Sequence, residues 1–288
     1  MTAQTETSRL TRCLLMHPRE AWGDQGRIDR EWSALGYTAR PDRSRATAEY
    51  DAFAQIFRSA GVQIEWLHPA AGLTLDAIYV RDASVVSDRG VVLCRMGKPD
   101  REHEPAVQGE AFETLGLEVL GSIEGAGRLE GGDVVWLAQD TLAVGIGYRT
   151  NAEGLEQLAS LLGPGVEILP VHLPHWRGHG DVFHLMSILS PIDGDLALVY
   201  SPLMPVTFRE ELRARGYELV EVPDEELDMG PNAVALGPRR VVLEAANGET
   251  RHRLEAAGVE VITYGGDEIS RKGLGGPTCL TRPLAREP

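Results

Sequence analysis

Five segments of this chain repeat one short pattern, and that pattern limits the folds open to it. Each segment has a stretch of helical periodicity, a break at glycine, and a run in which apolar and polar residues alternate as in a half-buried strand. The glycine suits the left-handed turn that ends many helices. The five segments are residues 58–67, 113–120, 162–169, 213–220 and 255–262.

A further apolar run precedes most of these helices, and we expect each run to be a strand. The runs are residues 91–94, 142–144, 196–200 and 241–243. The units recur at roughly 40 to 55 residues, a period typical of repeat architectures. A strand–helix–strand unit used five times favours radial closure. The predicted fold is therefore a five-bladed, pseudo-symmetric α/β propeller with its helices outside.

Two other architectures are open to such a pattern. A linear solenoid fits less well, because no segment resembles a polar capping repeat. An ordinary doubly wound sheet is the second alternative. No linker or block of like charge divides the chain, so we expect a single domain over residues 1–288.

Composition bounds the class of protein. With 43% hydrophobic and 25% charged residues, the chain matches an ordinary globular domain that buries a sizeable core. Residues 1–11 are polar and lack the apolar run of a signal peptide or membrane span, so we expect a cytoplasmic protein without membrane association. The formal charge of −15 argues against a nucleic-acid partner and is compatible with a cationic substrate.

The three cysteines differ in their surroundings. Cys13 and Cys94 lie in apolar, strand-like runs, where a small buried side chain is expected. Cys279 follows a Gly-Gly-Pro-Thr loop, and a thiol in such a loop can serve as a nucleophile. Three widely spaced cysteines favour neither a disulfide framework nor a zinc site.

Other candidate residues lie in the loops between the repeated units, which would face a common centre. Asp82 follows a strand-like run at residues 77–80. Glu130 and Asp133 flank a Gly-Gly pair, and we expect Asp133 to order this loop through backbone hydrogen bonds. His184 opens an apolar stretch. We expect these residues to meet Cys279.

Four histidines lie close together in sequence: His172, His175, His179 and His184. Their spacing gives no His-Glu-x-x-His pair, and Pro174 would interrupt a helix that aligned them. We therefore predict no metal site.

In these motifs the chain resembles the guanidino-group-modifying enzymes, which include dimethylarginine dimethylaminohydrolases, arginine deiminases and amidinotransferases. Residues 129–134 resemble the acid loop of these enzymes, and residues 148–154 resemble their substrate-carboxylate segment. Residues 184–187 are similar to the histidine segment of dimethylarginine dimethylaminohydrolases. Residues 270–279 resemble the nucleophile loop of arginine deiminases. The resemblance spans nearly the whole chain and implies a five-bladed α/β propeller.

The resemblance also implies a chemistry that needs no metal or organic cofactor. Asp82 and Glu130 would hold a guanidinium group through paired hydrogen bonds. Cys279 would attack the guanidino carbon, and His184 would protonate the departing amine. His184 would then activate water to hydrolyse the covalent thiouronium intermediate. The products would be citrulline, or another ureido compound, and an amine or ammonia.

Further substrate-binding residues follow from the same resemblance. Asp76 matches a position that binds an α-amino group, while Arg101 and Arg149 match arginines that bind a carboxylate. Arg95 is an alternative to Arg101, because the intervening loop shifts the alignment. His179 is an alternative base to His184. The segment 22–46 is expected to be an irregular loop over the site.

The substrate we expect is a small guanidino compound, arginine or an N-substituted arginine. Met186 stands where the deiminases carry a second guanidinium-binding Asp, which favours dimethylarginine dimethylaminohydrolase activity. Arginine deiminase is the close alternative, and an amidinotransferase is more distant. A propeller that binds guanidino compounds without catalysis is the alternative from a different class. A homodimer is compatible with all of these.

Overall fold

The computed structural model describes residues 2–181 and 183–287, and its strands form five three-stranded sheets. The first sheet contains β15 (Arg282–Arg286), β1 (Leu10–Leu15) and β2 (Gln63–Trp66). The second contains β3 (Ser84–Ser87), β4 (Gly90–Leu93) and β5 (Val119–Ser122), and the third β6 (Val134–Ala138), β7 (Thr141–Ile146) and β8 (Glu167–His172). The fourth contains β9 (Leu189–Asp193), β10 (Leu196–Val199) and β11 (Glu218–Glu221), and the fifth β12 (Val234–Gly237), β13 (Arg240–Glu244) and β14 (Glu260–Tyr264).

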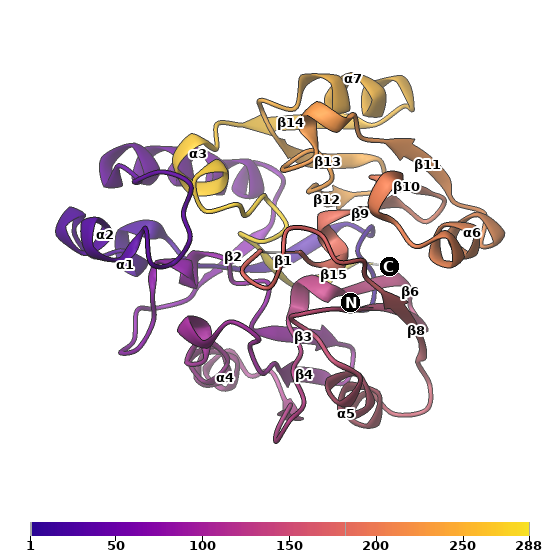
Figure 1. Ribbon diagram of the computed structural model, residues 1–288, viewed down its shortest axis with the longest axis horizontal. Coiled ribbons are helices and arrows are strands. Elements are labelled where there is room, and N and C mark those ends of the chain that lie inside the picture. The colour runs from indigo at the N-terminus through magenta and orange to yellow at the C-terminus, as the bar shows by residue number, and fades with distance from the viewer. Residues whose placement is uncertain (1, 182, 288) are drawn as a thin grey trace.

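All five sheets have the same topology. The central strand pairs antiparallel with one neighbour and parallel with the other. Helical structure connects the two parallel strands and lies on the outside of the molecule (Figure 1). The helices are α1 (Pro18–Ala21), α2 (Gln25–Glu31), α3 (Arg43–Ser59), α4 (Glu104–Thr114), α5 (Ala152–Leu162), α6 (Val206–Ala214) and α7 (Gly248–Ala256).

Short turns of helix connect the remaining elements. They are η1 (Leu75–Ile78), η2 (Pro99–Arg101), η3 (Gly131–Asp133), η4 (Leu185–Ser187), η5 (Ser201–Leu203), η6 (Asp224–Glu226) and the π-helical η7 (Asp267–Arg271).

The repeated unit predicted from the sequence is confirmed. The five predicted segments contain the ends of α3, α4, α5, α6 and α7 and the strands that follow them. A glycine in the left-handed region ends each helix: Gly61 (φ 78°), Gly116 (72°), Gly163 (81°), Gly216 (90°) and Gly258 (80°). The α/β class is therefore correct, and the five sheets remain separate rather than forming one closed sheet.

The two ends of the chain meet in the first sheet. β15 pairs antiparallel with β1, with Leu10 opposite Arg286. Thr2 and Arg286 exchange two backbone hydrogen bonds of 2.9 and 2.7 Å. The N- and C-termini consequently lie close together near the middle of the view in Figure 1. This pairing ties the last unit to the first.

Two local predictions are wrong. Residues 77–80 do not form a strand, because η1 begins at Leu75 and the Thr74 hydroxyl accepts a hydrogen bond from the Asp76 amide. The segment 22–46 is not an irregular loop, since it contains α2, which the Asp24 side chain caps, and the start of α3. Trp22 is fully buried, and its indole N–H donates to the Leu75 carbonyl at 2.9 Å.

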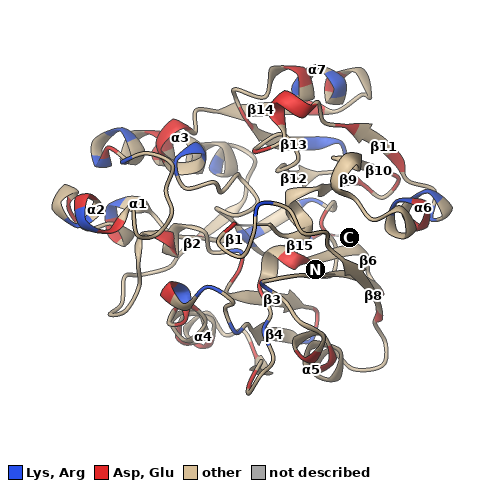
Figure 2. Ribbon diagram, in the orientation of Figure 1, with Lys and Arg blue, Asp and Glu red and all other residues tan. Residues whose placement is uncertain are grey.

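The surface carries charges of both signs. Figure 2 shows Lys and Arg side by side with Asp and Glu on the outer helices α2, α3 and α7. Cys13 and Cys94 are buried, as predicted. Among the described residues, every helix is too short or too polar to cross a lipid bilayer.

The glycine that ends α4 provides a test of the repeated unit. Gly116 has φ 72°, and an added Cβ would meet no atom within 4 Å, so a substitution there would cause backbone strain alone. We expect Gly116→Ala to lower the free energy of unfolding by about 1–2 kcal/mol. Gly248→Ala is the matched control, because Gly248 is the first residue of α7 and its Cβ position is equally open. Urea denaturation should show no loss for this control, and equal losses for both variants would contradict the prediction.

Candidate functional site

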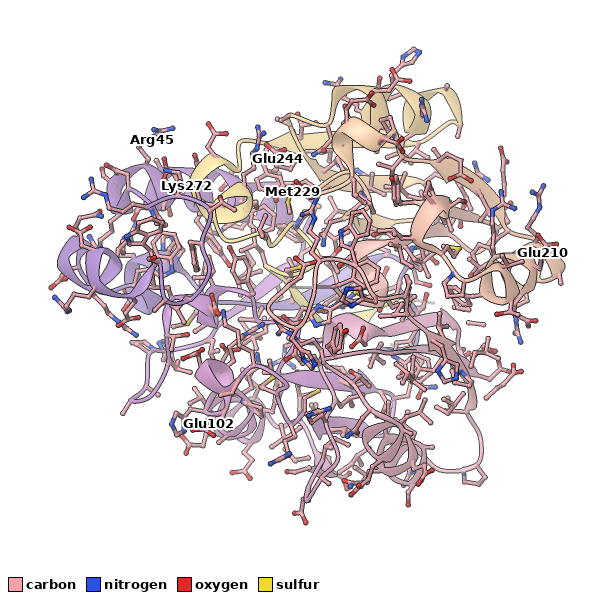
Figure 3. The ribbon with its side chains drawn as sticks, viewed as in Figure 1. Arg45, Glu102, Glu210, Met229, Glu244 and Lys272 are labelled. Atoms are coloured by element: carbon pink, nitrogen blue, oxygen red, sulfur yellow. The ribbon has the colours of Figure 1, made fainter. Side chains whose placement is uncertain are left out.

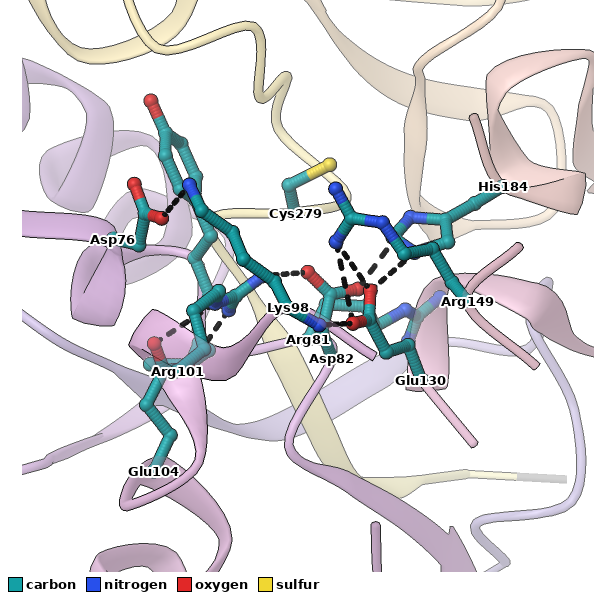
Figure 4. A network of polar contacts seen from close by, with 12 residues as sticks. Asp76, Arg81, Asp82, Lys98, Arg101, Glu104, Glu130, Arg149, His184 and Cys279 are labelled. Atoms are coloured by element: carbon teal, nitrogen blue, oxygen red, sulfur yellow. Dashed lines mark hydrogen bonds and ion pairs between the residues drawn. The ribbon is translucent and has the colours of Figure 1, made fainter. Parts of the chain in front are cut away.

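Four of the predicted residues lie together, and they come from four different sheets. Each precedes the strand that pairs antiparallel with the centre of its sheet. Asp82 precedes β3, Glu130 precedes β6, His184 precedes β9 and Cys279 precedes β15. Figure 4 shows their side chains directed toward one another, with the Cys279 sulfur on one side of the group. The equivalent loop before β12 contributes Asn232.

The centre of this group is a buried contact between Glu130 and His184. The imidazole Nε2 lies 2.7 Å from Glu130 Oε2, and the side chains are 0% and 4% exposed. The backbone N–H groups of Gly97 and Lys98 donate to Glu130 Oε1 at 2.8 and 3.1 Å. Arg149 Nη1 donates to both carboxylate oxygens at 3.2 and 3.1 Å.

These contacts favour a charged pair. Burial opposes the imidazolium, but the carboxylates of Asp82, Asp133 and Glu130 raise the pKa of His184 to about 9. Burial would raise the pKa of Glu130, yet His184 and Arg149 hold that pKa below its ordinary value. His184 is therefore an imidazolium at neutral pH, able to donate a proton.

Asp133 supports the loop, as predicted. Thr150 Oγ1 donates to its Oδ2 at 2.6 Å, and the Leu185 N–H donates to its Oδ1 at 2.9 Å. Burial raises the pKa of Asp133 to about 6. The carboxyl group thus joins the acid loop to the segment that carries His184.

Asp82 has one oxygen engaged and one without a hydrogen-bond partner among the described residues. Arg101 Nη1 donates to Oδ2 at 2.6 Å. Oδ1 is buried, accepts no hydrogen bond and lies 3.8 Å from His184 Nδ1. A Cβ on Gly132 would collide with His184 and Asp82, so the Gly-Gly turn lets these two side chains approach. A buried oxygen of this kind is a natural acceptor for an N–H group of a ligand.

Cys279 lies partly exposed beside Asp82. Burial and the negative charge of Asp82 raise the pKa of the thiol to about 11. The Asn232 side chain donates to the sulfur at 3.3 Å, and Cys279 O accepts from the Arg81 N–H at 3.2 Å. The resting thiol is therefore protonated at neutral pH. Asp82 is the acid whose charge favours this protonated form.

The predicted substrate-end residues are engaged with protein partners. Asp76 Oδ2 pairs with Lys98 Nζ at 2.5 Å. Arg101 donates to Glu104, to Asp82 and to the Tyr79 carbonyl. Burial opposes its charge, but the carboxylates of Glu104 and Asp82 favour it, so the pKa of Arg101 lies well above its ordinary value. Arg149 lies on Glu130, as described. Arg101 and Arg149 thus contact acids in this structure.

Two cavities meet at Cys279. The larger, about 320 Å³, is lined by the substrate-end group Asp76, Asp82, Lys98, Arg101 and Arg149. The smaller, about 60 Å³, is lined by His184, by the apolar side chains of Phe183, Met186 and Met229, and by polar residues that include Asp181 and Asp228. The imidazole and the carboxylate of Asp82 line different cavities, and their nearest atoms, Nδ1 and Oδ1, are 3.8 Å apart.

The alternative residues lie farther out. His179 is exposed at the rim of the larger cavity, with its ring 4.0 Å from that of Tyr148. Arg95 is exposed and lines a different cavity, one that contains none of the other predicted site residues. Leu35 and Gly36, from the segment expected to cover the site, do line the larger cavity.

A further cavity of about 490 Å³ lies next to α3 and is lined by residues that include Arg45, Met229, Glu244 and Lys272 (Figure 3). Its cations pair with acids of the same lining. Arg45 and Lys272 contact the Glu268 carboxylate at 3.2 and 2.5 Å. Acids outnumber cations in this lining, so the cavity carries an excess of negative charge.

Asp82, Glu130 and His184 offer donor atoms within 4.8 Å of one another, the only such set of ligand atoms among the described residues. These atoms could bind a metal ion. However, the guanidinium groups of Arg101 and Arg149 already contact the two carboxylates, and such cations oppose the binding of another.

Sequence reasoning missed two residues of the site, Asn232 and Lys98. Asn232 occupies the loop of the fifth repeated unit that corresponds to those of Asp82, Glu130 and His184. Comparing equivalent loops would have found it. No comparable signal marks Lys98, which lies in a loop whose course the sequence leaves open.

The effect of Asp82 on two pKa values generates a prediction. Asp82 raises the pKa of both His184 and Cys279, so Asp82→Asn should lower both, from about 9 and about 11. NMR titration of His184 and the pH dependence of Cys279 alkylation measure the two values. Asp133→Asn is the control, because Asp133 raises the pKa of His184 and is not among the main influences on Cys279. An unchanged thiol pKa in Asp82→Asn would contradict the electrostatic account.

Comparisons with known proteins agree with this arrangement. The family model described as N,N dimethylarginine dimethylhydrolase, eukaryotic, matches residues 27–286. An uncharacterized protein from Aeropyrum pernix is 30% identical over 250 residues, which cover 85% of this chain and 86% of the relative. The arginine deiminase of Mycobacterium marinum is 34% identical over 193 residues. That match covers 56% of this chain and 47% of the deiminase, so the chain spans about half of that relative's length.

Solved structures share the fold. A cysteine-to-serine variant of DDAH from Pseudomonas aeruginosa, complexed with citrulline, has a TM-score of 0.77 at 23% identity, covering 95% of this chain and 98% of that one. The product-bound N-terminal domain of ArgZ, a cyanobacterial arginine dihydrolase, has a TM-score of 0.82 at 21% identity, covering 96% and 97%. From the match to its family model, the chain belongs to the dimethylarginine dimethylaminohydrolase family of the guanidino-group-modifying enzymes.

Proposed function

We propose that this chain is a cysteine-dependent hydrolase that attacks the guanidino carbon of an N-substituted arginine and releases citrulline and an amine. The observation that carries the proposal is the meeting of three groups at one place. These are a thiol at Cys279, a buried acceptor oxygen on Asp82, and an imidazolium at His184. Each group supplies one requirement of the reaction: nucleophile, anchor and acid.

The reaction begins when a guanidinium group enters beside Asp82 and donates an N–H to Oδ1. Its positive charge lowers the pKa of the adjacent thiol, whose proton passes to water. Cys279 Sγ then forms a bond to the guanidino carbon. His184 donates its proton to the departing nitrogen, and the C–N bond breaks to release the amine. The product of this half-reaction is a thiouronium bound to Cys279.

Hydrolysis reverses the role of the imidazole. Neutral His184 accepts a proton from a water molecule as that water attacks the same carbon. The C–S bond then breaks, the ureido product forms, and Cys279 leaves as a thiolate. Glu130 accepts the His184 Nε2–H and so stabilises the imidazolium at the start and end of the cycle.

The smaller cavity favours a substituted nitrogen as the leaving group. It adjoins both His184 and the sulfur, and Phe183, Met186 and Met229 give it apolar walls. Its volume of about 60 Å³ suits small alkyl groups. Arginine deiminase activity is the second candidate, favoured by the similarity to mycobacterial arginine deiminases.

The larger cavity suits the amino-acid end of the substrate. We propose that Asp76 binds the α-amino group and that Arg149 and Arg101 bind the carboxylate once their present acid contacts loosen. Lys98, which pairs with Asp76, is a further cation in this cavity. The paired charges of Asp76 and Lys98 complement a zwitterion. The ammonium group of the substrate would face Asp76, and its carboxylate would face Lys98.

At the level of the fold, we propose that the five repeated units close around the shared site as the blades of one propeller domain. The pairing of β15 with β1 supports closure. The origin of Asp82, Glu130, His184 and Cys279 in four different units supports it as well.

Substrate identity is tested by supplying dimethylarginine, monomethylarginine, arginine and short guanidino acids, and measuring ureido product and released amine. We expect higher kcat/KM for the methylated arginines than for arginine, because their leaving groups fill the smaller cavity. Preference for arginine, with release of ammonia, would instead favour the deiminase.

The nucleophile is tested by Cys279→Ser, which should lower kcat by about 10³-fold or more while the fold persists. Cys94→Ala is the control, because Cys94 is buried away from both cavities that meet at Cys279. It should retain turnover. Normal turnover in Cys279→Ser would refute the covalent mechanism.

A further inference from the structure

The loop before β12 holds Asn232 at the place where the other four units hold Asp82, Glu130, His184 and Cys279. Its side chain is 7% exposed and lines the smaller cavity beside the sulfur. Asn232 is thus the fifth member of a set in which every unit supplies one polar side chain.

Two hydrogen bonds fix the orientation of the Asn232 amide. Its Oδ1 accepts from the Thr278 backbone N–H at 2.9 Å. Because a backbone N–H is only a donor, the atom that faces it must be the amide oxygen. The other end of the amide is therefore Nδ2, which donates to Cys279 Sγ at 3.3 Å.

The surroundings hold this amide in place. A Cβ on Gly276 would collide with the Asn232 side chain, so the nucleophile loop packs directly against it. Behind it, Ser190 Oγ accepts from the Ala233 N–H at 3.1 Å and donates to the Pro231 carbonyl at 2.7 Å. The donor is consequently positioned before any substrate arrives.

We propose that Asn232 is a catalytic residue whose side-chain N–H stabilises the negative charge on the Cys279 sulfur, both during attack and when the thiolate is expelled. A neutral amide suits this task. It stabilises an anion without repelling the guanidinium cation, as a lysine in the same place would. The bond to sulfur strengthens as the sulfur gains charge, so it favours the thiolate over the thiol.

Several other charged or titratable groups act on the sulfur. Asp82 opposes its ionisation and Arg101 favours it. Tyr79 and Tyr264 are electrostatically coupled to it, and His184 lines the same cavity. The Gly276 backbone also favours ionisation of the sulfur, and it packs against Asn232. The test therefore needs a control that disturbs this loop without removing the amide.

The test measures alkylation of Cys279 by iodoacetamide across pH, with the modified peptide quantified by mass spectrometry. A hydrogen bond to a charged group is worth roughly one to two pKa units, so Asn232→Ala should move the midpoint upward by about that amount. Asn232→Asp keeps an oxygen for the Thr278 N–H, lacks the donor to sulfur and adds a negative charge beside it, so it should move the midpoint upward by more than Asn232→Ala does. A midpoint unchanged in either folded variant would overturn the proposal.

Ser190→Ala is the matched control. It removes the support behind the loop without touching the sulfur, so it should lower the melting temperature and leave the alkylation midpoint unchanged. If Ser190→Ala shifted the alkylation midpoint as much as Asn232→Ala does, Asn232 would only hold the loop in place.

The inference rests on the proposed role of Cys279 as the nucleophile, but its main readout needs no substrate. If no guanidino compound is turned over, the hydrolase proposal fails while the alkylation result still decides the role of Asn232. If turnover is found, Asn232→Ala should lower kcat by about 10-fold or more and leave KM nearly unchanged, because Asn232 touches the sulfur and does not line the larger cavity. A raised KM with normal kcat would contradict the proposal.

Discussion

The buried pair of Glu130 and His184 is the interaction on which the site depends. Both groups are withdrawn from water, so each depends on its charged neighbours: Glu130 on His184 and Arg149, and His184 on Glu130 and Asp82. Glu130 also accepts the backbone N–H groups of Gly97 and Lys98, and the loop that they begin leads to Arg101. Arg101 in turn holds Asp82. Glu130 thus positions His184 directly. It positions Asp82 indirectly, through the loop that carries Arg101.

The fold makes this possible by supplying equivalent loops. Each unit is small, and its three-stranded sheet brings to the site the loop before its antiparallel edge strand and, in two units, the loop after its central strand. A site with a nucleophile, an acid and a buried anchor therefore needs several units at once. The pairing of β15 with β1 brings the last loop, with Cys279, to the loops of the earlier units. A change that weakens the pairing of β15 with β1 would then displace Cys279 as well as lower the free energy of unfolding.

The sequence was sufficient to predict the periodic features of the structure. The five helix-ending glycines and the strands around them follow from local patterns, and these were correct. Local capping overrode pattern at residues 77–80, where the Thr74 hydroxyl starts η1 in place of a strand. The partners of Arg101 could not be foreseen, because Glu104 and Asp82 approach it only in the folded chain. An amide is no obvious catalytic group, so the one signal for Asn232 in the sequence is its position in the loop that is equivalent to those of Asp82, Glu130 and His184.

The occupied carboxylates change how recognition of a guanidinium should be understood. The sequence suggested that Asp82 and Glu130 would both grip the substrate, yet each already contacts an arginine of the protein. The remaining acceptor is the buried Oδ1 of Asp82, close to the imidazole. A cation that reaches this oxygen also neutralises the charge that keeps the thiol protonated. In the proposed mechanism one atom would thus serve both recognition and activation, and the sulfur would stay protonated until the substrate binds.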